Sequence, residues 1–303
     1  MCPPRMHYDE VATDASLVRR LLAAQFPDWA DLPIRRVASD GTDNAIYRLG
    51  DDMAVRLPRI HWAAHIVEKE HRWLPRLAPH LPLAIPAPLV MGMPGEGYPW
   101  RWSVYRWLEG EPARIDRLAD PVGAANDLAR FILALQSVDA SGGPLAMDHN
   151  LRGVTLAMRD SQTRAAIAAM EGIADTGTLT EIWEEALQVP EWARRPVWFH
   201  GDMLSGNVLL KDGRVSAVID FGGLGVGDPA CDLMIAWGLF SGDSRDAFRS
   251  ALAVDDATWA RGRGRALSQA VIFIPYYLDT NPVGVARARR ALDEIIDEHR
   301  RGA

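Results

Sequence analysis

Three polar side chains lie close together in a stretch that otherwise combines glycines with short apolar runs. They are Asp202, Asn207 and Asp220, within HGDMLSGNVLLKDGRVSAVIDFGG at residues 200–223. Oxygen ligands from Asp and Asn suit a hard cation such as Mg²⁺, which takes one or two protein carboxylates together with substrate phosphates. A further carboxylate can act as a base toward a hydroxyl. Asp and Asn also form ordinary turns, but the three together in this framework favour chemistry.

The residues between these side chains predict a strand, a loop and a β-hairpin. Residues 197–199 are expected to form a strand, and Asp202 follows in a loop flanked by glycines, where a side chain can face a ligand. Strands are expected at 208–210 and 215–219, joined by a turn at 211–213. Asn207 then starts one strand and Asp220 ends the next, so the hairpin brings amide and carboxylate to neighbouring strand ends.

A second candidate pair lies nearer the N-terminus. In DMAVRLPR at residues 52–59, the alternation of a strand puts Ala54 and Arg56 on one face. Glu70 lies on the apolar face of a helix predicted at 62–77, where an unpaired carboxylate would be costly. We therefore expect an ion pair between Arg56 and Glu70. The alternative is that Glu70 lies at the edge of the apolar face and extends to water.

The predicted elements divide the chain into a small sheet-rich lobe and a larger helical lobe. The first lobe has a helix at 14–26, three strands within 34–59, a helix at 62–77 and two strands before Gly110. The second has helices at 122–139, between about 152 and 188, and again after Asp228. We expect an α+β fold with lobes at 1–109 and 110–303 and a hinge at about 105–112.

The composition of the 303-residue chain excludes several classes of protein. A net charge of −7 argues against a general nucleic-acid binder, which needs a basic face to neutralise phosphates. The two cysteines give no disulfide framework, and the eight histidines show no zinc-ligand spacing. No run approaches the ~20 apolar residues of a membrane span, and no apolar targeting segment is visible at the start. We expect a cytoplasmic protein with neither a nucleic-acid nor a membrane partner.

The opening motif resembles the signature of the aminoglycoside phosphotransferase family, which is related to protein kinases. The family pattern has His-Gly-Asp, an Asn five residues later, an Ile-Asp-Phe/Leu-Gly segment and often a Gly-Asp-Pro-x-x-Asp helix start. All are present between residues 198 and 234, and the order of the lobes extends the likeness to the whole chain. The resemblance implies a bilobal kinase-like fold, with Asp202 as catalytic base and Asn207 and Asp220 holding Mg²⁺ on the nucleotide phosphates.

The resemblance also assigns nucleotide-binding residues to the first lobe. The strand with Ala54 and Arg56 takes the place of the kinase V-A-I-K strand, where alanine lies against adenine and lysine binds phosphates. Arg56 replaces that lysine and is also cationic, but the two side chains are not interchangeable. Glu70 would orient Arg56 as the glutamate of the kinase Lys–Glu pair does.

Two further segments complete the nucleotide site that the resemblance implies. The backbone of Ser39, Gly41 and Thr42 would cover a phosphate, although this segment has a single glycine and is equally a plain hairpin turn. The backbone from Arg106 to Leu108 would meet the edge of the base. Tyr105 would stand in the gatekeeper position, where its bulk would favour GTP over ATP.

The implied reaction moves the γ-phosphoryl group of ATP or GTP to a hydroxyl of a small molecule. An aminoglycoside antibiotic is the first expectation, because the family takes it and an acidic protein suits a cationic acceptor. The enzyme would then confer antibiotic resistance. A macrolide, a tuberactinomycin-type peptide antibiotic, or a metabolite such as choline are alternatives.

Two other classes of protein compete with this interpretation. His-Gly-Asp in place of His-Arg-Asp, and the lack of a segment ending in Ala-Pro-Glu, argue against a protein kinase. A nucleotide-binding pseudoenzyme is motivated by Arg56 and by the single glycine of the phosphate loop. The intact Asp202, Asn207 and Asp220 argue against a pseudoenzyme.

Overall fold

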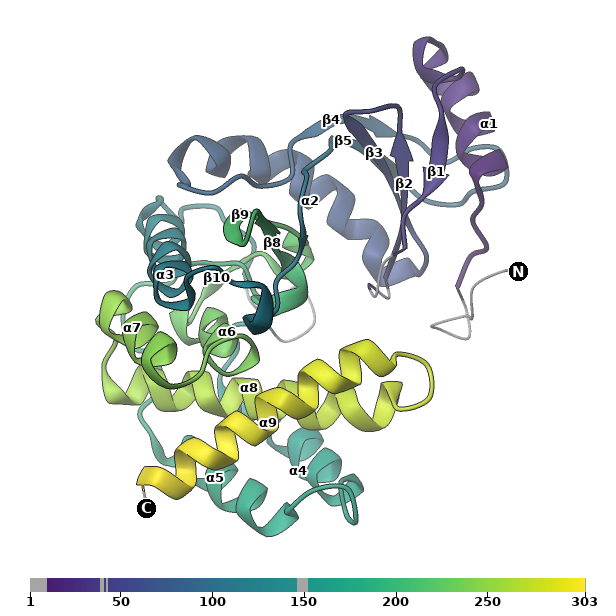
Figure 1. Ribbon diagram of the computed structural model, residues 1–303. Helices are drawn as coiled ribbons and strands as arrows, with labels where there is room; N and C mark the ends of the chain where they lie inside the picture. Colours follow the sequence, from purple (N-terminus) through teal and green to yellow (C-terminus); the bar gives the residue numbers. More distant parts are fainter. Residues whose placement is uncertain (1–9, 39–40, 42, 146–151, 303) are drawn as a thin grey trace. The chain divides into compact units, whose positions relative to one another are not determined.

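The computed structural model describes residues 10–38, 41, 43–145 and 152–302 (Figure 1). The chain forms two compact units, one of Met1–Pro79 with Ala84–Glu109 and the other of His80–Leu83 with Gly110–Ala303. An antiparallel sheet dominates the first unit and helices dominate the second. The predicted α+β fold class, with strands first and helices afterwards, is confirmed.

The N-terminal unit is built on a five-stranded antiparallel sheet in the order β1-β2-β3-β5-β4. The strands are β1 (Ile34–Arg36), β2 (Asn44–Leu49), β3 (Met53–Pro58), β4 (Pro88–Gly92) and β5 (Trp102–Arg106). Strand β3 lies in the middle and is buried along its whole length, whereas buried and partly exposed residues alternate along β2. Both β2 and β5 pair with β3, so Arg56 and Ala54 lie at the centre of the sheet.

Two helices pack on this sheet. Helix α1 (Ala15–Gln25) packs beside β1, and its N-cap Asp14 accepts the N–H of Leu17 at 2.7 Å. Helix α2 (His61–Leu77) packs against β3, β4 and β5. The helix predicted at 62–77 is therefore confirmed. Its apolar side chains are buried as their spacing requires, and Glu70 is buried among them.

Helices make up most of the C-terminal unit. They are α3 (Pro121–Ser137), α4 (Asp160–Ala169), α5 (Thr176–Gln188), α6 (Ile235–Gly238), α7 (Gly242–Leu252), α8 (Asp256–Tyr277) and α9 (Pro282–Gly302). Helix α8 packs against α4, α5 and α9, while α3 packs against α7 (Figure 1). The helix predicted at 122–139 is α3, which begins at Pro121 behind an Asp120 cap.

Short strands in the same unit carry the segment with the predicted chemistry. Strand β7 (Val197–Phe199) pairs with β10 (Gly225–Gly227), and β8 (Val208–Lys211) pairs with β9 (Arg214–Val218). The turn is Asp212–Gly213, and both residues have left-handed backbone conformations (φ +52° and +73°), as such two-residue turns require. Strand β6 (Glu111–Pro112), which the sequence pattern did not predict, adds to β8.

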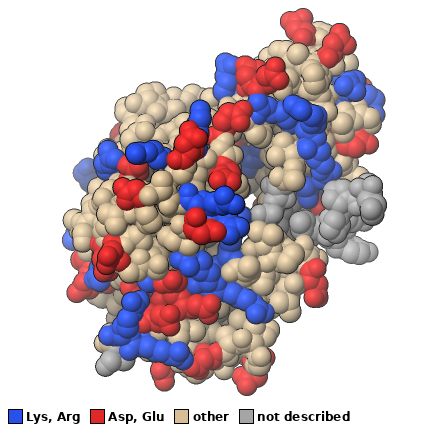
Figure 2. Space-filling view, in the orientation of Figure 1, with Lys and Arg blue, Asp and Glu red and all other residues tan. Residues whose placement is uncertain are grey.

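Charged side chains of both signs are visible on the surface of the protein (Figure 2). On the face seen in Figure 2, lysine and arginine side chains are interspersed with acidic ones. Within the described residues, no helix has both the length and the apolar character needed to cross a membrane.

Candidate active site

Asp202 is held through its backbone and its side chain by other residues of its own loop. The N–H of Asp202 donates to Nδ1 of His200 at 3.1 Å. The amide nitrogen Nδ2 of Asn207 donates to the backbone oxygen of Asp202 at 2.9 Å and to its carboxylate Oδ2 at 3.0 Å. The structure therefore brings Asp202 and Asn207 into direct contact. Both side chains are only partly buried, so the carboxylate can still meet a ligand.

His200 and Asp232 hold this loop in place through hydrogen bonds to its backbone. The buried Asp232 accepts the N–H of His200 at 2.7 Å and that of Gly201 at 2.8 Å. Burial raises the pKa of the Asp232 carboxyl above its ordinary value, although these two N–H groups and the neighbouring His200 lower it. Nε2 of His200 lies 3.0 Å from the carbonyl oxygen of Ile219. Since Nδ1 accepts from Asp202, Nε2 carries the proton and donates it to Ile219.

The glycine of the His-Gly-Asp motif is required by close packing. Gly201 has a left-handed φ of +84°, and a Cβ at this position would lie 2.2 Å from the carbonyl oxygen of Gly223. A side chain would therefore separate the loop from the segment that follows Asp220. Because glycine has no Cβ, the loop and the segment after the hairpin can pack backbone against backbone.

Asn207 and Asp220 lie at neighbouring ends of the hairpin and are suited to a cation. Asn207 is the last residue of a 3₁₀ turn (Ser205–Asn207), and its carbonyl oxygen accepts the N–H of Ile219 at 2.8 Å. Asp220 follows in the left-handed region, with φ +63°, which Asp tolerates better than most side chains. Because Nδ2 of Asn207 is directed at Asp202, its oxygen Oδ1 is the atom left for a cation.

These residues fit a cation that is shared with phosphates better than a closed metal centre. Within the described ranges, no three His, Cys, Asp or Glu side chains are grouped so as to hold a metal ion. One carboxylate and one amide oxygen match the small protein share of a typical Mg²⁺ shell, which substrate phosphates and water complete.

Arg56 and Glu70 form a buried ion pair in the N-terminal unit. Nη1 of Arg56 lies 2.7 Å from both carboxylate oxygens of Glu70. The Glu70 side chain is 0% exposed and that of Arg56 is 11% exposed. The hydroxyl of Tyr105 donates to Oε2 of Glu70 in a short hydrogen bond. Burial, followed by the nearby Glu70 carboxylate, raises the pKa of Tyr105 well above its ordinary value, so the hydroxyl keeps its proton.

The structure describes some, but not all, of the other residues predicted to bind the nucleotide. Ala54 is buried on β3 opposite Tyr105. The N–H of Arg106 donates to the carbonyl oxygen of Ala87 at 2.9 Å, and the N–H of Trp107 to that of Asp52 at 2.7 Å. Within this segment, the N–H of Leu108 is thus the donor left for a base edge. Gly41 is exposed, whereas Ser39 and Thr42 lie outside the described residues.

The sequence analysis missed one contact of Tyr105 and did not identify Arg152 at all. Tyr105 was predicted to shape the base slot, but its hydroxyl also completes the Arg56–Glu70 pair. Strand alternation could have indicated this, because residues facing each other across an antiparallel pair share a face. Arg152 donates to Asp202 and Gly201, and no local pattern marks it, since it lies about 50 residues before the motif.

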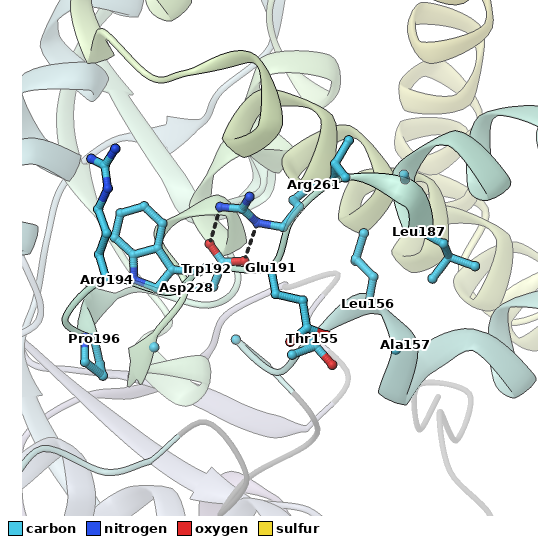
Figure 3. A pocket seen from close by; sticks show the side chains of 14 residues that line it. Thr155, Leu156, Ala157, Leu187, Glu191, Trp192, Arg194, Pro196, Asp228 and Arg261 are labelled. Atoms are coloured by element: carbon cyan, nitrogen blue, oxygen red, sulfur yellow. Dashed lines mark hydrogen bonds and ion pairs between the residues drawn. The ribbon is translucent and has the colours of Figure 1, made fainter.

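A cavity of about 200 Å³ lies in the C-terminal unit (Figure 3). Pro196 and Gly227 line it, at the end of the β7–β10 ribbon opposite the loop with Asp202. Its wall contains a buried ion pair, with Nε of Arg261 at 2.9 Å from Asp228. Its lining does not include Asp202, Asn207 or Asp220, so it is separate from the candidate site.

Comparison with known proteins identifies the family to which the sequence is similar. Residues 34–267 match the model of the phosphotransferase enzyme family. Among functionally curated proteins, none matches the chain.

Solved structures with the same fold include antibiotic phosphotransferases. The GDP and kanamycin complex of APH(2")-IIIa has 20% identity and a TM-score of 0.71, covering 93% of this chain and 98% of that one. The streptomycin–ATP complex of APH(2")-IIa has 18% identity and a TM-score of 0.59, covering 87% and 91%. Macrolide 2'-phosphotransferase MphH from Brachybacterium faecium has 24% identity and a TM-score of 0.61, covering 92% and 98%. At these identities, the likeness establishes the kinase-like fold alone.

Proposed function

Since the chain belongs to the phosphotransferase enzyme family, we propose that it moves the γ-phosphoryl group of ATP or GTP to a hydroxyl of a small molecule. The observation that carries this proposal is the joint placement of Asp202 and Asn207 in one hydrogen-bonded loop, with Asp220 at the adjoining end of the hairpin. A base for a hydroxyl and two oxygen ligands for a cation are the groups this reaction needs.

Asp202 is the proposed base. In the reaction, the acceptor oxygen forms a bond to the γ-phosphorus, while the bond from that phosphorus to the bridging oxygen breaks and the nucleoside diphosphate leaves. The acceptor proton passes to the carboxylate of Asp202. The hydrogen bond from Nδ2 of Asn207 supports this role, because it orients the carboxylate before the acceptor arrives. The backbone N–H of Asp202, which donates to His200, holds the main chain of the loop in place.

Asn207 and Asp220 are the proposed ligands for Mg²⁺. When bound, the ion would neutralise charge on the nucleotide phosphates. Asn207 would also link the two tasks, since its Nδ2 orients the base and its Oδ1 would meet the ion.

The N-terminal unit is the proposed nucleotide-binding part. Arg56 would bind phosphate, oriented by Glu70 and indirectly by the hydroxyl of Tyr105. Ala54 would lie against the base, and Leu108 with Arg106 would meet its edge. Relatives of the same fold bind GDP in one case and ATP in another, so both nucleotides belong in the test.

An aminoglycoside is the first acceptor to test, because one structural relative was solved with kanamycin. A macrolide is the second, because two relatives are macrolide 2'-phosphotransferases. Tuberactinomycin antibiotics, choline and a pseudoenzyme without an acceptor complete the set of alternatives.

The test is an acceptor panel with ATP and with GTP, read as the mass gain of one phosphoryl group on the acceptor. We expect Asp202→Asn to lower turnover by about 10²- to 10⁴-fold, the usual share of a positioned base. Asp212→Asn is the matched control, because Asp212 lies exposed in the turn of the same hairpin. Unchanged turnover in Asp202→Asn would overturn the assigned mechanism. Nucleotide binding without any acceptor turnover would instead favour the pseudoenzyme.

A further inference from the structure

Arg152 contacts the proposed base directly. Its Nη1 donates to the carbonyl oxygen of Gly201 at 2.7 Å and, in a shorter hydrogen bond, to carboxylate Oδ1 of Asp202. One nitrogen therefore ties together two consecutive residues of the loop. The side chains of Arg152 and Asp202 are 22% and 19% exposed, so the pair is largely shielded from water, yet a small ligand can reach it.

The two carboxylate oxygens of Asp202 have different partners. Oδ2 accepts from Asn207, which belongs to the same loop, and Oδ1 accepts from Arg152, which belongs to a segment 50 residues earlier. Fixing one oxygen leaves a carboxylate free to swing about its terminal torsion, which has a broad energy minimum. Fixing both oxygens sets the plane of the carboxylate and hence the direction of its remaining lone pairs.

The segment that carries Arg152 is anchored to helix α8. Arg265 of that helix donates to the carbonyl oxygen of Val154, two residues beyond Arg152. Farther along the same segment, Nε of Arg159 donates to the hydroxyl of Ser268, also on α8, at 3.0 Å. Although burial lowers the pKa of Arg152, the charge of Asp202 raises it above the ordinary value overall. Arg152 therefore stays protonated and is a fixed cation.

We infer that Arg152 is a positioning residue, which orients the Asp202 carboxylate toward the acceptor hydroxyl from outside the loop at residues 200–207. This inference rests on the proposed function. It assigns Arg152 no contact with the reacting atoms, and its guanidinium keeps its proton throughout. The opposite role is a latch, in which Arg152 occupies Asp202 and must leave before an acceptor can bind.

The test compares Arg152→Lys, Arg152→Gln and Arg152→Ala in the full-length enzyme. We expect Arg152→Gln to lower kcat by about 100-fold, the order of loss caused by a misplaced catalytic group, with the KM for nucleotide changed less than about 3-fold. Arg152→Lys should recover at least about 10-fold of that loss, because an ammonium can also donate to two oxygens. Millimolar guanidinium should partly restore kcat in Arg152→Ala, since the deleted group leaves a site of its shape.

Arg245→Gln and Arg245→Ala are the matched controls. Arg245 is a buried arginine of helix α7 whose Nη2 donates to a carboxylate oxygen of Glu294 at 2.6 Å, outside the segment that carries Arg152. These variants should lower the melting temperature while kcat changes less than about 2-fold, and guanidinium should not raise their turnover.

Three results would overturn the inference. The first is a kcat for Arg152→Gln equal to or above that of the unaltered enzyme, which is what a latch predicts. The second is a loss of kcat that neither lysine nor guanidinium reverses. The third is the same loss in the Arg245 controls. If Asp202→Asn turned over as fast as the unaltered enzyme, that result would instead count against the proposed function.

A measurement without turnover separates the two failures. If Arg152 and Asp202 are coupled, the melting temperature of Arg152→Gln with Asp202→Asn should lie above the value expected from adding the two single shifts. Additive shifts would contradict the pairing itself, whatever the reaction of the enzyme.

Discussion

The buried pair of Arg56 and Glu70 allows stability and nucleotide use to be separated by mutation. Glu70→Gln keeps the size of the side chain but removes the carboxylate charge that faces the buried guanidinium of Arg56. Removing one partner of a buried pair costs about 3–5 kcal/mol. Glutamine retains one oxygen that can accept from Arg56, so we expect the lower end, about 3 kcal/mol. The hydroxyl of Tyr105 also loses its carboxylate acceptor.

Glu68→Gln is the matched control for this prediction. Glu68 lies on the same helix and also pairs with an arginine, Arg101, but the two side chains are 55% and 41% exposed. Exposed pairs contribute about 0–1 kcal/mol. The same chemical change two residues away should therefore have little effect on stability.

Urea unfolding measures the overall change, and hydrogen exchange locates it. Because the chain has two compact units, a single two-state transition is not assumed. A loss of about 3 kcal/mol corresponds to opening that is more than about 100-fold more frequent. Amides of β3 and α2 should therefore exchange faster by that factor in Glu70→Gln and not in Glu68→Gln. Equal effects of the two variants, or a change below about 1 kcal/mol for Glu70→Gln, would refute the reasoning.

The triple variant Arg56→Met, Glu70→Leu, Tyr105→Phe extends this test to function. Replacing a buried ion pair with apolar side chains of similar volume is often neutral or stabilising, so we expect stability to return to within about 1 kcal/mol of the unaltered protein. Nucleotide binding should be lost, because the proposed phosphate-binding cation is gone. A triple variant that is stable and still binds nucleotide would show that Arg56 does not hold phosphate.

Three further predictions concern other contacts. Asp232→Ala leaves the buried N–H groups of His200 and Gly201 without their acceptor and should lower the free energy of unfolding by about 2–5 kcal/mol, whereas exposed Asp246→Ala should change it by less than about 0.5 kcal/mol; equal losses in urea unfolding would contradict this role. Arg56→Lys should keep a cation and lose about 10-fold in kcat/KM for nucleotide, whereas Arg56→Ala should lose about 100-fold or more; equal losses in steady-state kinetics would contradict a phosphate contact. Asp14→Ala should cost about 1 kcal/mol at pH 7 by removing the cap of α1. Because the N–H of Leu17 lowers the pKa of Asp14 below its ordinary 3.8, that difference is present above pH 3.8 and should shrink as the pH falls below it. A difference between the two proteins that stays constant from pH 6 to about pH 2.5 would contradict this account.

The elements that were predicted well from the sequence have either an apolar pattern that recurs over several turns or a clearly marked turn. Helix α2 was placed within one residue because its apolar side chains recur over several turns and one face is buried. The hairpin of β8 and β9 was also placed within one residue, since Asp212–Gly213 marks its turn. Strand β6 was missed because two residues, one of them Pro112, have no period to detect. Its pairing depends on Leu209 and Leu210, about 100 residues away.

In the candidate site, the contact between residues close in sequence was predictable, whereas the contact between residues far apart in sequence was not. Asp202 and Asn207 are five residues apart, so one loop is enough to bring them together, and the motif predicts their contact. Arg152 reaches Asp202 only because Arg265 and Arg159 fix its segment to α8. The pairing is thus determined by tertiary packing, and no spacing within the motif encodes it.

The contact between Arg152 and the proposed base depends on a residue of helix α8, Arg265. A substitution on α8 at Arg265 lies far in sequence from residues 200–207 and touches none of them among the contacts described. It would nevertheless release Val154 and, with it, the position of Arg152. We therefore expect Arg265→Gln to lower kcat while the KM for nucleotide stays nearly constant, as in Arg152→Gln. The decisive comparison combines the two changes: if Arg265 acts through Arg152, the double variant should be no slower than Arg152→Gln alone, whereas multiplied losses would mean that Arg265 acts by a separate route.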